Sequence, residues 1–185
     1  MKSNLIKIFE GKKSQGFTLL EVIVAIFLIT VGVIATYSLV AFSTSSMSYV
    51  SNKFTAAYLA QEGIELVRNI RDTNWLEGSS IDWRDGLADF CFTGVCNGDS
   101  NFGCIIDFSY SQTKTPFLPQ YTGQYLKKNS NNYGYYVLGG SDTKFRRKVY
   151  INNFSNMLEV CVWVEWMEKG TSHRIVVREN LWDWR

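Results

Sequence analysis

The stretch from Phe17 to Phe42 is apolar, and Glu21 is its single charged side chain. At a rise of about 1.5 Å per residue, a helix over this stretch is about 39 Å long, which is enough to cross the hydrocarbon core of a bilayer. A charge inside such a helix costs on the order of 3 kcal/mol at mid-bilayer, but Glu21 lies near one end. The stretch therefore predicts a membrane helix.

The residues around Glu21 form a recognisable motif. They read Gly16-Phe17-Thr18-Leu19-Leu20-Glu21, after a short polar and basic lead-in at residues 11–15 and before the long apolar run. This arrangement resembles the type IV prepilin signal. The resemblance implies that a prepilin peptidase cleaves between Gly16 and Phe17 and that the new amino terminus at Phe17 is methylated. It also makes Glu21 the fifth mature residue, with a role in docking during assembly.

Two ordinary targeting signals explain the amino-terminal segment less well. A secretory signal peptide has an apolar region of about 7–15 residues followed by its cleavage site, whereas this run is longer and follows the expected cut. A plain signal anchor accommodates the length and the basic flank. However, it gives no reason for the Gly16-Phe17 pair or for an acid one turn into the span.

Length and charge limit the rest of the chain. With 185 residues, 46% apolar side chains and two prolines, we expect one membrane helix and one modest globular domain. Removing residues 1–16 takes four lysines and one glutamate from the 19 basic and 17 acidic residues, so the net charge falls from +2 to about −1. No global basic field then favours nucleic acid. The lysines of the leader predict a cytoplasmic amino terminus and an outward carboxyl-terminal domain.

The four cysteines predict disulfides in that outward domain, because it would face an oxidising compartment. They are Cys91, Cys96, Cys104 and Cys161, and they allow three pairings. Local pairing and a link to Cys161 are both open, and we favour one bond among the first three with another reaching Cys161. Zinc is disfavoured because there is no C-x-x-C and His173 is the single histidine. We expect no metal and no cofactor.

The helix is expected to continue beyond the membrane. Ser43 to Ser46 contains no helix breaker, and apolar residues then recur at spacings of three and four. The stripe consists of Met47, Val50, Phe54, Ala57, Ala60, Ile64, Val67 and Ile70. It predicts a helix from Phe17 to about Asp72 whose second half is the spine of the globular domain. The amino-acid sequence of residues 58–72 also resembles the corresponding part of minor pilins and pilus-modification proteins.

Downstream sequence predicts strands. Residues 73–103 lose periodicity, Cys104 to Tyr110 and Tyr133 to Leu138 read as short strands, and Ser111 to Asn132 reads as loop. Apolar and polar side chains alternate more clearly in three later segments, Lys144–Phe154, Leu158–Met167 and Arg174–Arg178. These segments predict an antiparallel meander whose apolar face lies on the helix stripe. The fold class is therefore α+β, a pilin-like fold. Its expected parts are a leader (1–16), a transmembrane half-helix (17–42), an amphipathic half-helix (43–72) and a globular domain (73–185).

Two further groups of residues have competing interpretations. Lys144, Arg146, Arg147 and Lys148 form a basic cluster, but alternation divides them between two strand faces, which argues against a nucleic-acid site. Trp182 and Trp184 are either core residues or anchors for a neighbouring subunit. No catalytic motif appears, and one histidine makes a triad improbable, so we expect no enzyme and no small-molecule substrate.

Together these features predict a structural subunit, a minor pilin of a type IV pilus-like filament. Its expected partners are the prepilin peptidase, other pilin subunits, the inner-membrane assembly platform and, before assembly, membrane lipid. It would lie in the cytoplasmic membrane as a single-pass protein and then in a surface pilus. Two alternatives stay open: a pseudopilin of a type II secretion or DNA-uptake system, and a membrane-anchored adhesin or binding module.

Overall fold

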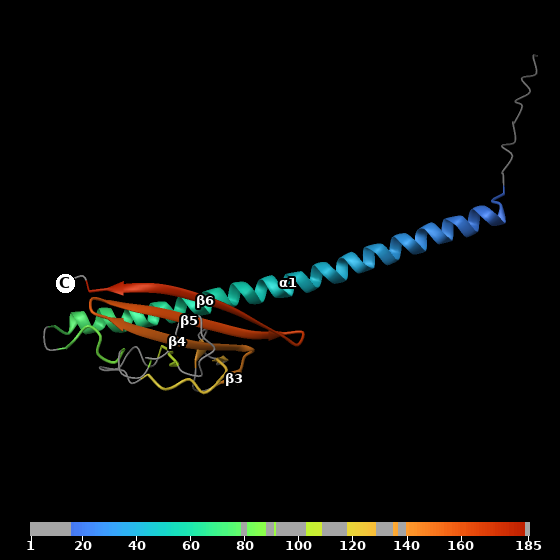
Figure 1. Cartoon of the computed structure of the whole chain (residues 1–185). Helices are drawn as coiled ribbons and strands as arrows, with labels where there is room; N and C mark the ends of the chain where they lie inside the picture. Colours follow the sequence, from blue (N-terminus) through green and yellow to red (C-terminus); the bar gives the residue numbers. More distant parts are fainter. Residues whose placement is uncertain are drawn as a thin grey trace, which may run out of the picture. The chain divides into compact units, whose positions relative to one another are not determined.

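The structure is a computed structural model that describes residues 16–78, 81–87, 91, 103–108, 118–128, 135–136 and 140–183. Its elements are α1 (Leu19–Leu76), β1 (Lys127–Lys128), β2 (Tyr135–Tyr136), β3 (Ser141–Asp142), β4 (Phe145–Phe154), β5 (Met157–Glu168) and β6 (Thr171–Trp182). Figure 1 labels α1 and the strands β3 to β6. The chain divides into two compact units, Met1–Met47 and Ser48–Arg185.

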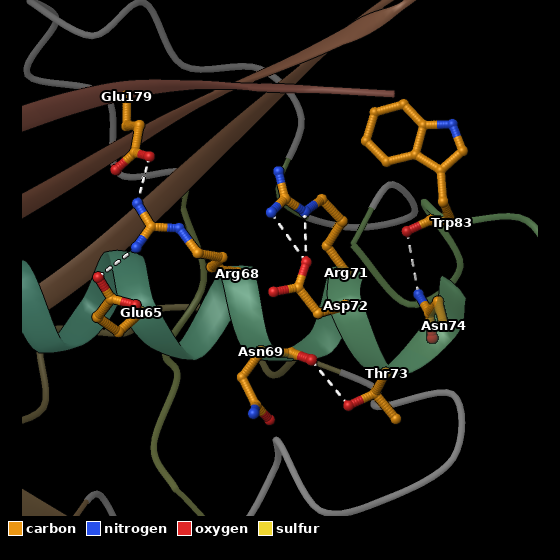
Figure 2. A network of polar contacts seen from close by, with 9 residues as sticks. All are labelled: Glu65, Arg68, Asn69, Arg71, Asp72, Thr73, Asn74, Trp83 and Glu179. Carbon is orange, nitrogen blue, oxygen red and sulfur yellow. Dashed lines mark hydrogen bonds and ion pairs between the residues drawn. The ribbon is translucent and has the colours of Figure 1, made fainter. Parts of the chain in front are cut away.

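Helix α1 runs through Ser43–Ser46 without a break and ends at Leu76, one turn beyond the predicted end at Asp72. The last turn is held by Asn74, whose Nδ2 donates to the carbonyl oxygens of Trp83 and Asp85 at 3.2 and 2.9 Å. Figure 2 shows the contact with Trp83. The chain then turns at Gly78, whose φ of 95° is a conformation that glycine adopts without strain.

The buried face of α1 differs from the predicted stripe. Ala60, Ile64, Val67 and Ile70 are buried as predicted, whereas Met47, Val50 and Phe54 are exposed. The buried residues are Ala56, Leu59, Ala60, Gly63, Ile64, Leu66, Val67, Ile70, Arg71, Asn74 and Trp75. This face is centred on Gly63, where a Cβ atom would lie 2.8 Å from Val162 Cγ1 on the sheet. The small residues at positions 56, 60 and 63 thus let this face of α1 pack closely on the sheet. Hydrophobic periodicity alone did not predict which face this would be.

The predicted antiparallel meander on the helix is confirmed, with strand order β4-β5-β6. Val149 pairs with Val162, and Val162 pairs with Val177, so one face of the sheet stays apolar across all three strands. β6 is longer than predicted because every residue from Thr171 to Trp182 pairs with β5. The turn before it has positive φ at both Lys169 and Gly170, which suits a tight hairpin.

Of the remaining strand predictions, Tyr133–Leu138 is confirmed in part by β2, whereas the Cys104–Tyr110 strand and the Ser111–Asn132 loop need correction. In the described part of the Cys104–Tyr110 segment, pairing is limited to bridges from Cys104 to Gln120 and Val149. Ile105 and Ile106 bury their side chains in the core without a strand ladder. The predicted loop Ser111–Asn132 contains β1, which pairs with β2 and β3 in a second small sheet. Trp182 is 56% exposed and is not a core residue, while Trp184 lies outside the described residues.

Ion pairs fasten the helix to the edge of the sheet. Arg68 contacts both Glu65 on its own helix and Glu179 on β6, as Figure 2 shows. The hydrogen bond to Glu179 is the main cause that raises the pKa of Arg68. One turn on, Arg71 pairs with Asp72 at 2.8 Å and stacks over Trp75. The Arg68–Glu179 ion pair thus links α1 to β6, whereas the contacts of Arg71 lie within α1.

Candidate processing and assembly site

The amino-terminal end of α1 is capped by its own sequence. The backbone N–H of Glu21 donates to Thr18 Oγ1 at 3.3 Å, and the helix begins at Leu19. This is the position of an N-cap residue, which satisfies one of the N–H groups that a helix start leaves unpaired. Sequence reasoning missed this role of Thr18, although Thr-x-x-Glu before an apolar run is the pattern of a capping box.

Gly16 and Phe17 precede the helix and are exposed, with Phe17 at 80%. A Cβ atom added at Gly16 would meet nothing within 4 Å. The fold therefore gives no steric reason for a glycine at this position. An exposed Gly16-Phe17 bond outside the helix is accessible to an enzyme that reads a small residue followed by an apolar one.

Glu21 lies in the first turn of α1. A carboxylate at this end interacts favourably with the partial positive charge of the helix terminus. It is four residues from Phe17, so a cleavage before Phe17 would place a cationic amino group about one turn away from this carboxylate. After such a cleavage, the start of α1 would present one negative and one positive group about one turn apart.

The helix that follows is long and apolar enough to cross a membrane by length and composition. Its large apolar side chains from Phe17 to Phe42 are exposed. The hydroxyl groups within it bond to carbonyl oxygens of the preceding turn, at 2.8 Å for Thr30 to Phe27 and 3.0 Å for Ser38 to Ile34. A lipid environment requires such internal hydrogen bonds because it offers no water.

The cysteine region contains a disulfide between Cys91 and Cys104, one of the pairings left open by the sequence. Cys161 is also disulfide-bonded, and Cys96 lies outside the described residues. Cys104 exchanges two backbone hydrogen bonds of 2.8 Å with Val149, and the Cys91 carbonyl accepts from Ile151 N–H at 3.4 Å. These hydrogen bonds hold Cys91 and Cys104 against β4, and the disulfide joins the two residues.

The structure separates the residues of the basic cluster. Arg147 faces the core and is 2% exposed, whereas Arg146 and Lys148 lie on the opposite face of β4. Arg147 Nη1 donates to the Leu59 carbonyl and to Glu62 Oε2, both at 3.0 Å, and Nη2 donates to the Ile106 carbonyl at 2.7 Å. Burial lowers the pKa of Arg147, and Glu62 opposes this shift. Arg147 is a structural residue.

Among the described residues, no group of three His, Cys, Asp or Glu side chains is arranged to hold a metal ion. His173 on β6 instead packs against aromatic rings, with its ring centroid 5.0 Å from that of Tyr49 and 5.4 Å from that of Trp166.

Comparison with known proteins supports one family. Residues 11–37 match the family described as the prokaryotic N-terminal methylation motif. No curated protein and no solved structure matched the chain. The matched segment contains Gly16, Phe17 and Glu21 and the first turns of α1. It supports a type IV pilin-like protein with a structural role, and the apolar helix is compatible with membrane anchoring.

Proposed function

We propose that this chain is a minor pilin, a structural subunit of a type IV pilus-like filament that is cleaved after Gly16 and methylated at Phe17. One observation carries the proposal: the methylation motif at residues 11–37 coincides with the start of the exposed apolar helix. The expected cut lies two residues before the helix begins. In this proposal residues 1–16 are the leader, 17–42 span the membrane, and the rest forms the outer part.

The orientation rests on two independent features. Lys2, Lys7, Lys12 and Lys13 precede the span, and positive charge of this kind is retained in the cytoplasm. The disulfide of Cys91 and Cys104 is expected in an oxidising compartment, which lies on the other side of the membrane. Both features support a carboxyl-terminal domain outside the cytoplasm.

Assembly in this proposal moves α1 from lipid into a bundle of equivalent helices. The transfer is roughly neutral for apolar side chains, because lipid tails and leucine-rich helices are equally apolar. Specificity must then come from packing and from Glu21. Its carboxylate would pair with the amino group of Phe17 on a neighbouring subunit, and a wrong register would leave a buried charge unpaired.

The decisive experiment is intact mass spectrometry of the protein from membranes of its producing cell. We expect a mature chain that begins at N-methylated Phe17. A chain that retains residues 1–16, or that begins elsewhere, would overturn the assignment. Recovery of the mature chain in sheared surface filaments then supports a pilus subunit. Its absence from them would favour a pseudopilin, which has the same amino terminus.

A further inference from the structure

The face of the sheet that points away from α1 gathers charged side chains in register. Arg146 on β4 pairs with Glu165 on β5, and Glu165 pairs with Arg174 on β6. In the next row, Lys148 pairs with Trp163. Side chains that are opposite on one face of a sheet lie within about 5.5 Å at Cβ. The register of the three strands thus brings Arg174 of β6 close to Arg146 and Lys148 of β4, which are far from it in the sequence.

A pocket of about 580 Å³ lies on this face. Its sheet side is formed by Arg146, Lys148, Trp163, Glu165 and Arg174. Its second wall is the segment Gln120, Tyr121, Thr122 and Gly123. Backbone bonds hold this wall in place, since Tyr121 N–H donates to the Gly103 carbonyl at 2.8 Å. The volume falls in the range of pockets that hold small ligands. We call it the outer-face pocket.

The charge of the outer-face pocket favours an anion. Three cationic side chains and one carboxylate line it, so its formal charge is +2. Arg146 stacks over Tyr125 with its Cζ 4.1 Å from the ring centroid, and it donates to the Tyr125 hydroxyl. Its Nε is buried without a hydrogen-bond partner in the described part of the chain. Arg146 is therefore held in place while one of its donors stays unsatisfied.

The aromatic ring of Trp163 in the pocket is covered by the cationic side chains of Lys148 and Arg174. Trp163 is 6% exposed, and Lys148 Nζ and Arg174 Cζ lie 4.1 and 4.9 Å from its ring centroid. Recognition of single-stranded nucleic acid relies on open rings on which bases stack. This ring is not open, so the pocket favours a ligand that brings anionic groups without aromatic ones.

We propose that the outer-face pocket binds a carboxylated sugar unit of an acidic polysaccharide. The planar guanidinium groups of Arg146 and Arg174 match a carboxylate in geometry and charge. Glu165 accepts a hydrogen bond from Ser172 at 2.6 Å, and together with Gln120 and Thr122 it offers acceptors and donors to sugar hydroxyls. Glu165 would repel a polyphosphate, with its several charges, more strongly than a single carboxylate, and a polyphosphate would leave these groups unused. This inference is independent of the proposed filament role.

The test uses the full chain in neutral detergent micelles and titration calorimetry. The probe is a tetrasaccharide of alternating glucuronic acid and N-acetylglucosamine, and its carboxyl-reduced form is the ligand control. Arg174→Gln and Arg178→Gln are matched variants, because both residues are exposed on the same face of β6 and Arg178 pairs with Glu159 outside the pocket. Their exposure makes misfolding of either variant a minor concern.

We expect the acidic tetrasaccharide to bind and the reduced form not to bind. Arg174→Gln should weaken binding about tenfold or more, since it removes a charge-assisted hydrogen bond, and Arg178→Gln should change it less than about twofold. The proposal is overturned if the acidic probe does not bind or if both variants lose affinity equally. It is also overturned if a ten-residue oligothymidylate binds more tightly than the sugar.

Discussion

Arg147 of β4 donates to the Glu62 carboxylate of α1 at 3.0 Å, with a side chain that is 1% exposed. Glu62 is 35% exposed, so removing Arg147 costs stability mainly because the Leu59 and Ile106 carbonyls lose their donor, at about 1–3 kcal/mol each. We expect Arg147→Met to lower the free energy of unfolding by about this amount, measured by urea denaturation. Arg68→Met is the control, since that pair with Glu179 is one-third exposed and should contribute about 1 kcal/mol or less. Equal effects of the two substitutions would contradict the assignment.

Gly63 should resist replacement by alanine even though it lies inside a helix. Alanine gains about 1 kcal/mol in helix propensity, but the added Cβ would lie 2.8 Å from Val162 Cγ1. Overpacking of this kind costs about 1–3 kcal/mol, so we expect a net loss of about 1 kcal/mol in the unfolding free energy. In the double variant with Val162→Ala the two losses should be less than additive. Strict additivity would show that the contact is not close.

Asp82 should make the domain more sensitive to acid. Its hydrogen bond from Arg84 holds the pKa of Asp82 below the ordinary 3.8. A lowered folded-state pKa contributes stability that is present above pH 3.8 and is lost as the pH falls through the folded value. Asp82→Asn and Arg84→Gln should therefore each flatten the fall of unfolding free energy between pH 5 and 2. The double variant should show the same pH dependence of the unfolding free energy as each single variant. A single variant with the pH dependence of the unchanged protein would contradict the role of the Asp82–Arg84 pair.

Gly16→Leu should block cleavage without blocking membrane insertion. The fold tolerates a side chain at this position, since a Cβ would meet nothing within 4 Å, so any loss reflects the peptidase. We expect the variant to stay at precursor size in the membrane fraction on immunoblots. Gly32→Leu, also without neighbours at its Cβ, is the control and should be processed normally. A mature-size Gly16→Leu product that begins at Phe17 would contradict the cleavage site.

Glu21→Gln should separate processing from assembly. It keeps the size of the side chain and removes its charge, so cleavage after Gly16 should persist while incorporation into filaments falls. The measurement is the ratio of subunit in sheared filaments to subunit in membranes, at matched expression. Thr18→Ser keeps a capping hydroxyl and should leave the ratio unchanged. An unchanged ratio for Glu21→Gln would remove the docking role and leave only recognition by the peptidase.

The sequence predicted the features that depend on strong periodic patterns. Strict alternation in Leu158–Trp166 predicted the central strand and its core face, and the run after Phe17 predicted the first half of α1. The methylation-motif match at residues 11–37 agrees with the resemblance drawn from Gly16 to Glu21.

Predictions failed where tertiary contacts override local pattern. Phe54 fits the helical stripe as well as Ile64 does, but the sheet approaches α1 around Gly63, so Phe54 stays exposed. Ile105 and Ile106 have strand propensity, yet they serve as core side chains in an irregular segment. The outer-face pocket was also missed, because Arg174 is far from Arg146 in the sequence and reaches it only through the register of β4, β5 and β6.

The disulfide of Cys91 and Cys104 has a consequence for how this chain can vary. Both ends of the enclosed segment are attached to neighbouring positions of one strand, at Ile151 and Val149. Lengthening a closed loop costs only about 0.6 kcal/mol for each doubling of its length. Insertions or deletions between the two cysteines therefore leave the entry and exit points on β4 unchanged. The length of this segment can thus change while the helix and the sheet stay the same.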